Sequence, residues 1–278
     1  MAGRFRYGCG MQTAAVAPSG FWGPPTSSID WCETNYAVSH YVAEWFNTLS
    51  SVPLIVVGLL GVRWHWRVLE RRFLLVFASV ALVGVGSTAF HGTLLFRLQM
   101  LDELPMLYTA TLMVYLLLEG NPKPAHGRWL PLALLAYLSV ATFGATVTRG
   151  SVQAWFFQVS FTLLEFLGLY LTYRIYRAST APDQRQAFRI GMALYSAAIV
   201  AWYIDFGHCE AWIAALAQVG LPNLQLHALW HVLVAGGLYL LILVIAHHRL
   251  HVLGREPYLE RRGWVLQLRA AGEASQTR

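Results

Sequence analysis

Three histidines stand in segments that are otherwise strongly apolar. His227 and His231 open the run LQLHALWHVLVAGGLYLLILVIAHH four residues apart, so in a helix both imidazoles lie on one face. His91 occurs in a second such segment, GVGSTAFHGTLLFRLQMLDELP. Three neutral imidazoles leave the fourth position of a tetrahedral zinc ion open for water. The pattern therefore predicts a catalytic metal site rather than a structural one.

Two polar residues near His91 in the sequence could take part in a reaction at such a metal site. Ser87 precedes His91 by four residues and shares its helical face, and Asp102 follows after a short predicted loop. A carboxylate can orient a metal-activated water and accept its proton, and a hydroxyl can stabilise a developing oxyanion. The set predicts hydrolysis. Taken singly, Ser87 fits a helix serine bonded to its own backbone, Asp102 fits a helix start, and each histidine fits an interfacial residue.

The composition indicates which solvent these segments meet. Hydrophobic residues make up 56% of the chain, charged residues 12%, and the mean hydropathy is +0.47, which is too apolar for an ordinary soluble domain. A membrane span needs ~20 apolar residues. We predict an all-α polytopic membrane protein with seven transmembrane helices, at residues 46–64, 73–93, 103–119, 129–148, 152–173, 187–206 and 226–246.

The lysines and arginines fall unevenly between the two sets of loops. Of the 20 such residues, all but Arg4, Arg6, Arg97 and Arg149 fall on one side when loops are assigned alternately. Cytoplasmic loops carry the basic excess, so we expect the N-terminus to be luminal or extracellular and the C-terminus cytosolic. The net charge of +6 then describes a rim facing anionic lipid headgroups, which argues against nucleic-acid binding.

Acidic residues gather at the opposite, outer end. Under this topology the outer carboxylates are those of Asp30, Glu33, Glu44, Asp102, Glu103, Asp205 and Glu210. The three histidines lie at the same depth. Because ionisable groups in or beside membrane helices are costly, their convergence indicates a functional cation site.

The same residues form motifs that resemble those of a known family. SxxxH occurs as Ser87 to His91, LDELP as Leu101 to Pro105, and HxxxH as His227 to His231. Together they resemble the alkaline ceramidases, seven-helix membrane amidases of the superfamily that includes the adiponectin receptors. The stretch GFWGPPTSSIDWCETNYAVSHYVAEWFNTLS resembles the calcium-binding N-terminal signature of that family. The resemblance runs from about residue 20 to about residue 250.

The resemblance implies a role for each matching residue. Zinc would be held by His91, His227 and His231, with Ser87 and Asp102 around the bound water. Calcium would be held by Asp30, Glu33, Asn35, Glu44 and the carbonyl of Trp31, oxygen donors that suit this hard ion. The family pattern also implies a disulfide between Cys32 and Cys209, with Cys9 left over. The simpler alternatives are a capped turn instead of the calcium loop, and free thiols.

The implied activity is hydrolysis of the N-acyl amide of ceramide, which yields a sphingoid base and a fatty acid. We expect one membrane domain, with an N-terminal segment (1–45), a helix bundle (46–248) and a basic cytosolic tail (249–278), in the endoplasmic reticulum or Golgi membrane. Glu165 is expected to bond to a neighbouring helix, and His208 to lie at the surface. Two alternatives are a receptor of the adiponectin-receptor type and a lipid or proton transporter.

Overall fold

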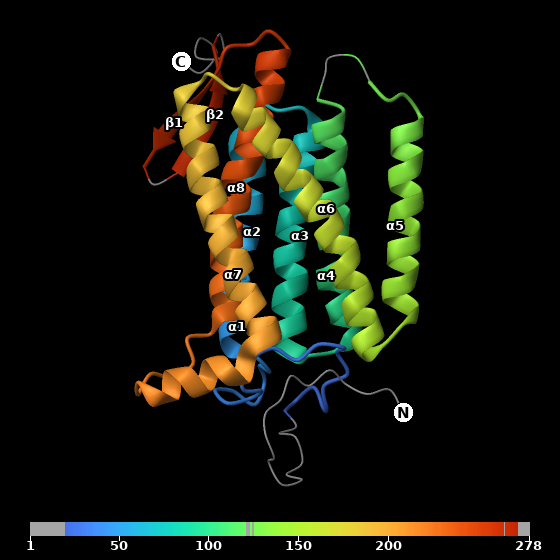
Figure 1. Ribbon diagram of the computed structural model, residues 1–278, viewed down its shortest axis with the longest axis vertical. Helices are drawn as coiled ribbons and strands as arrows, with labels where there is room; N and C mark the ends of the chain where they lie inside the picture. Colours follow the sequence, from blue (N-terminus) through green and yellow to red (C-terminus); the bar gives the residue numbers. More distant parts are fainter. Residues whose placement is uncertain (1–19, 121–122, 124, 264, 272–278) are drawn as a thin grey trace.

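Seven helical spans form the protein. The computed structural model describes residues 20–120, 123, 125–263 and 265–271. Within them, seven spans are long and apolar enough to cross a membrane, as predicted, and they pack into a bundle (Figure 1). The helices are α1 (Trp45–Ser50) and α2 (Val52–His65), which share the first span, then α3 (Arg71–Thr93), α4 (Phe96–Leu118), α5 (Trp129–Val147), α6 (Gly150–Ala178), α7 (Pro182–Gln218) and α8 (Leu226–Val252). Arg4, Arg6, Cys9 and Arg278 lie outside the described residues.

The connection between α3 and α4 is tighter than the hydropathy predicted. Leu94 ends α3 in the left-handed conformation, with φ 53°, and Leu95 already caps α4. The carbonyl of Leu94 accepts the amides of Thr26 and Ser27 from the N-terminal segment. The predicted start of this span at residue 103 was wrong, because α4 begins at Phe96 and Asp102 lies inside it. The alternative interpretation of Asp102 as a helix start is excluded for the same reason.

Two helices are interrupted at the end of the bundle that carries the predicted site. Ser51 separates α1 from α2, and Pro53 accounts for the break because it has no amide hydrogen to donate to the helical ladder. Helix α7 continues past the predicted end at residue 206 and kinks at His208, where φ is −136°. Beyond the kink, α7 runs across the end of the bundle rather than along it (Figure 1).

Small residues let the helices approach closely, as is typical of membrane bundles. A Cβ atom on Gly86 of α3 would lie 2.1 Å from the carbonyl oxygen of Leu101 on α4. A Cβ atom on Gly237 of α8 would lie 2.9 Å from the amide nitrogen of Tyr195 on α7. Glycine is therefore required at both contacts, and the contact at Gly86 brings α4 against the helix that carries Ser87 and His91.

A β-hairpin that the sequence analysis did not predict follows α8. Strands β1 (Pro257–Arg262) and β2 (Val265–Ala270) pair antiparallel, with Pro257 opposite Ala270. The hairpin lies at the end of the bundle opposite the N-terminal segment (Figure 1). Leu268 is fully buried there, and its amide donates to Nε2 of the buried His65 at 3.1 Å. The hairpin is thus packed against the bundle.

Candidate metal centre and lipid cavity

The three predicted histidines meet at one point. His91 comes from the last turn of α3, and His227 and His231 come from the first two turns of α8. One ring nitrogen from each histidine can be chosen so that all three lie within 4.8 Å of one another. All three side chains are buried. This is the one group of three or more His, Cys, Asp or Glu residues in the described part of the chain with metal-binding geometry.

The polar atoms of these histidines fit a metal ion. Nε2 of His91 and Nδ1 of His227 are buried and have no hydrogen-bond partner within the described residues. Leaving a buried polar atom unsatisfied costs ~1–3 kcal/mol, so two such nitrogens in one cluster indicate a missing partner. A metal ion that accepts their lone pairs would satisfy both. The buried histidine triad can therefore bind a metal.

Neighbouring side chains fix the orientation of two of the imidazoles. The carboxylate of Glu44 lies 2.5 Å from Nδ1 of His91, which turns Nε2 of that ring towards the other histidines. The hydroxyl of Ser50 lies 2.8 Å from Nδ1 of His231. Carboxylates and hydroxyls in these positions hold metal-binding histidines in one tautomer and one rotamer.

His227 is held by stacking and by its backbone. Its ring stacks on Trp31, with 3.6 Å between ring centroids, and also on Trp230, with 5.1 Å between centroids. Its amide donates to Oδ1 of Asp205 on α7 at 3.1 Å. The start of α8 is therefore tied both to the N-terminal segment and to α7.

Ser87 lies next to the histidines, as predicted. Its hydroxyl is 3.2 Å from Nε2 of His231 and 2.8 Å from the hydroxyl of Ser51, and it is buried. The simpler alternative, a serine bonded back to its own helix, is not what the structure has. A hydroxyl held beside the metal-binding nitrogens is placed to donate to an oxygen that develops negative charge there.

Asp102 reaches the same region from α4. The close approach at Gly86 sets α4 against α3 next to Ser87. Asp102 is almost fully buried and, with His227, lines a cavity of about 360 Å³ between α4, α6, α7 and α8. The carboxylate and the histidine cluster therefore border the same space. This cavity is called the outer cavity below.

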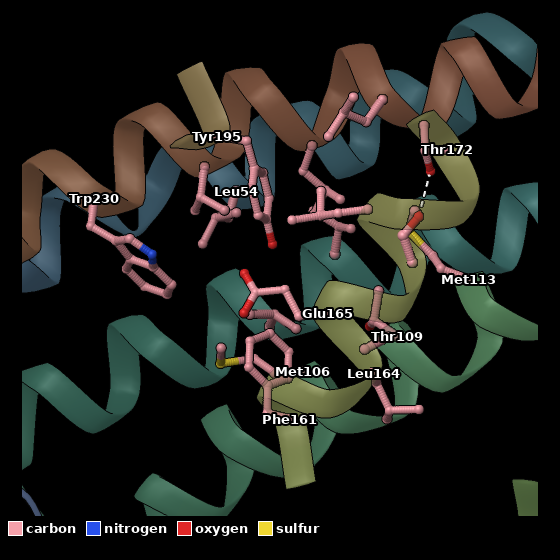
Figure 2. A pocket seen from close by; sticks show the side chains of 18 residues that line it. Leu54, Met106, Thr109, Met113, Phe161, Leu164, Glu165, Thr172, Tyr195 and Trp230 are labelled. Carbon is pink, nitrogen blue, oxygen red and sulfur yellow. Dashed lines mark hydrogen bonds between the residues drawn. The ribbon is translucent and has the colours of Figure 1, made fainter. Parts of the chain in front are cut away.

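The walls of the outer cavity are largely apolar, and side chains exposed on the outside of the bundle form part of them. Phe157 and Phe161 of α6 line it, and so do the exposed Phe166 of α6 and the exposed Val200 and Tyr203 of α7. An opening between α6 and α7 at this depth would face lipid tails in a membrane. A smaller inner cavity of about 100 Å³, with almost entirely apolar walls, adjoins it (Figure 2).

The predicted calcium residues lie in the N-terminal segment, and several of their side chains form local hydrogen bonds. Both carboxylate oxygens of Glu33 accept amides at the start of α1, from Phe46 and Asn47. Asn35 donates to Asp30 at 3.0 Å. Oδ1 of Asn35 and Oδ1 of Asn47 are buried without a partner among the described residues. The segment thus caps a helix and also presents unsatisfied oxygens.

Glu44 links this segment to the histidines. Its Oε1 accepts the amide of Trp31 at 3.4 Å, while its Oε2 accepts the Asn47 amide group at 3.0 Å and contacts His91. Burial, and next the charge of Asp30, raise the pKa of Glu44 to about 8. Burial likewise raises the pKa of Glu33, although the amides of α1 oppose this effect.

The predicted disulfide joins Cys32 to Cys209 across 177 residues. Two further contacts lie beside it. The amide of Cys32 donates to Asp205 at 3.2 Å, and Asn223 donates to the carbonyl of Cys32 at 2.9 Å. The N-terminal segment is therefore fastened to α7 and to the chain that leads into α8, next to His227.

Sequence reasoning missed the roles of Ser50, Ser51 and Asp205. The motif SSVP carried a signal for the two serines, because Pro53, three residues after Ser50 and two after Ser51, predicts a helix break. Asp205 was counted among the outer acids without a role. Its position between Cys32 and His227 depends on three distant segments, which no local pattern reports.

Comparison with known proteins identifies the family. The Ceramidase family model matches residues 23–272 of the chain. The chain belongs to the ceramidase family. Alkaline ceramidase YPC1 of Saccharomyces cerevisiae is 33% identical over 250 residues, which cover 83% of this chain and 79% of that protein. Alkaline ceramidase 3 of Mus musculus is 32% identical over 244 residues (84% and 88%), and the alkaline ceramidase of Arabidopsis thaliana is 31% identical over 222 residues (80% and 83%).

Proposed function

We propose that this ceramidase-family protein is a zinc-dependent amidase that hydrolyses the N-acyl amide of ceramide to a sphingoid base and a free fatty acid. The observation that carries the proposal is the buried cluster of His91, His227 and His231, which has two unsatisfied nitrogens and borders a cavity open to the membrane side of the bundle. The family of the chain favours this activity over the receptor and transporter alternatives.

Zinc is the metal that the donor set fits best. Three histidines without a fourth protein ligand are typical of catalytic zinc sites. When bound, zinc supplies Lewis-acid activation of the amide carbonyl and of a water molecule. The ligand nitrogens are expected to be those that Glu44 and Ser50 leave free.

The remaining steps fall to Asp102 and Ser87. The carboxylate of Asp102 accepts a proton from the water whose oxygen attacks the carbonyl carbon. It then delivers this proton to the amide nitrogen as the carbon–nitrogen bond breaks, so that the amine leaves neutral. The hydroxyl of Ser87 donates a hydrogen bond to the carbonyl oxygen while that oxygen carries negative charge. The apolar outer cavity holds the lipid chains and limits access of bulk water.

Replacement of Asp102 by Asn tests this assignment. The amide cannot accept a proton but has nearly the same shape, so we expect ceramide turnover to fall at least ~100-fold while the zinc content stays at the wild-type level. Turnover and zinc content are measured on the same purified sample. Loss of zinc together with activity would make Asp102 a metal ligand instead, and full turnover would remove it from the mechanism.

We also propose that the N-terminal segment binds calcium through Asp30, Glu33, Asn35, Glu44 and the carbonyl of Trp31. The oxygen donors of these residues and the orphaned amide oxygen of Asn35 support this site. Because Cys32 lies within the segment and is bonded to Cys209, bound calcium is expected to stabilise the chain around the start of α8.

The variant Asp30→Asn tests the calcium site better than a change at Glu44, which also contacts His91. Asparagine keeps an oxygen beside Asn35 but removes one negative charge. We expect calcium to raise the melting temperature of the wild type and to have a much smaller effect on Asp30→Asn, with zinc content equal in both. If neither calcium nor a calcium chelator changes the melting temperature of the wild type, the segment is only a capped turn and not a calcium site.

The membrane we propose is that of the endoplasmic reticulum or Golgi, where a disulfide on the luminal side forms readily. Imaging of the tagged full-length protein against markers of both organelles tests the location. Signal confined to another membrane would refute it.

A further inference from the structure

Glu165 is a half-buried acid that the proposed mechanism does not use. It lies near the middle of α6 and lines both the outer and the inner cavity, together with Met106, Phe161 and Trp230. Figure 2 shows its carboxyl group pointing into the inner cavity, towards the hydroxyl of Tyr195. A polar group thus stands where the two cavities join.

The polar group that Glu165 faces is the hydroxyl of Tyr195 of α7, which belongs to a neighbouring helix (Figure 2). The inner cavity also contains the hydroxyls of Thr109 and Thr172. These donate to the carbonyls of Pro105 and Gly168 in their own helices, and Figure 2 shows the second of these bonds. The threonines are therefore committed to the backbone.

Glu165 retains hydrogen-bonding capacity that faces the cavity. A carboxyl group offers two oxygens with about four lone-pair positions, and the single hydroxyl of Tyr195 can fill at most one of them. The residue is only partly buried although it lies in the interior of the bundle, because the cavity reaches its carboxyl group. An acid inside membrane helices is costly and marks a site of function by default.

The position of the pair excludes the reacting amide as its partner. Asp205 contacts the amide of His227 at the level of the metal centre, and Tyr195 precedes it on α7. At 1.5 Å per residue, the intervening helix spans ~15 Å. A substrate whose amide lies at the histidines therefore brings the middle of a hydrocarbon chain, and not its headgroup, to Glu165.

We propose that Glu165, supported by Tyr195, is a specificity-determining residue that selects lipids whose hydrocarbon chain carries a hydroxyl group remote from the amide. The chain runs from the outer cavity past Glu165 into the inner cavity, and the hydroxyl bonds to the free carboxyl oxygen. An unsubstituted chain leaves that oxygen without this partner. The kinetic test of this inference rests on the proposed amidase activity. The inference also predicts that the hydroxylated lipid binds more tightly than the unsubstituted one, which can be measured without turnover.

The test compares ceramides of one acyl length that are either unsubstituted or hydroxylated at successive positions along the chain. For the wild type we expect kcat/KM to peak at one remote hydroxyl position, ~10-fold above the unsubstituted substrate, the value of one hydrogen bond to a carboxyl group. Glu165→Leu removes the acceptor and should lower this ratio to about one, with the unsubstituted substrate still turned over.

Tyr195→Phe separates recognition from a merely structural role. If the pair only ties α6 to α7, Glu165→Leu and Tyr195→Phe should both slow all substrates alike and leave the preference unchanged. If Glu165 recognises the hydroxyl, Tyr195→Phe should keep the preference, because the carboxyl oxygens remain.

Tyr170→Phe makes the same chemical change on the exposed side of α6 and serves as the matched control. Glu165→Gln provides a second variant, which retains an acceptor, in case Glu165→Leu does not fold.

A binding measurement distinguishes failure of this inference from failure of the proposed function. The same lipids are titrated into the Asp102→Asn protein, and tryptophan fluorescence reports occupancy of the cavities that Trp230 lines. If the wild-type protein hydrolyses all the ceramides equally, the recognition of a hydroxyl group by Glu165 is refuted, and the proposed amidase activity is confirmed. If the wild-type protein hydrolyses none of the ceramides but the hydroxylated lipid binds more tightly, the proposed amidase activity is refuted, and the recognition of the hydroxyl group is supported. Equal binding of all lipids overturns the recognition.

Discussion

At the scale of single residues, the histidine cluster depends on side chains that would not bind the metal themselves. Glu44 and Ser50 each contact the Nδ1 atom of one histidine, so the Nε2 atoms of His91 and His231 are turned towards the site. Glu44 also belongs to the proposed calcium segment. One carboxylate thus couples the two proposed metal sites directly.

The contact between Glu44 and His91 predicts an effect on metal affinity. Glu44→Gln keeps a hydrogen-bonding oxygen but removes the charge that supports the imidazole, and we expect zinc affinity to fall ~10–100-fold. Competition with a chelator of known affinity measures it. Glu210→Gln, an exposed change at the same end of the bundle, is the control. Equal zinc affinity in Glu44→Gln and wild type would mean that Glu44 does not support the site.

The spacing of the motifs predicted the residues that meet at the site but not how they are oriented. SxxxH and HxxxH each place two side chains on one helical face, so the convergence of Ser87 with His91 followed from local geometry. The contact of Glu44 with His91 spans 47 residues, and that of Ser50 with His231 spans 181. Such contacts depend on helix packing and cannot be read from local periodicity.

At the scale of elements, hydropathy predicted seven spans and misplaced the ends that carry polar residues. Helix α4 starts earlier than predicted. Hydropathy missed its first turns because they contain Gln99, Asp102 and Glu103, whose side chains are buried in the bundle and do not face lipid. Gln99 and Gln153 of α6 both donate to the carboxylate of Glu103. Hydropathy measures preference for lipid, so it excludes a helical turn whose polar side chains satisfy one another inside the bundle.

The C-terminal hairpin is expected to stabilise the whole bundle. Leu268 is fully buried against the core, whereas Tyr258 of the same hairpin is exposed. Leu268→Ala should lower the free energy of unfolding by ~2–5 kcal/mol through loss of packing, and Tyr258→Ala should have little effect. Denaturant titration in detergent measures both. If the two variants are equally stable, the hairpin does not contribute to the core.

At the scale of the whole molecule, the two ends of the bundle differ in chemistry. The histidine cluster and the disulfide both involve the acidic N-terminal segment. The hairpin lies at the opposite end of the bundle from this segment (Figure 1). The charge distribution predicts that the metal end is luminal or extracellular. A protease site placed after residue 278 should be cut only from the cytosolic side of sealed vesicles. Cleavage from the opposite side alone would reverse the topology.

The central claim is that the three histidines hold a metal that ceramide hydrolysis requires. The most direct measurement is turnover of labelled ceramide by the purified protein as isolated, after removal of zinc by a chelator, and after zinc is added back. We predict that activity is lost with the metal and returns when about one zinc ion per chain is restored, and that His231→Ala shows no recovery. Undiminished turnover by zinc-free protein would contradict the account.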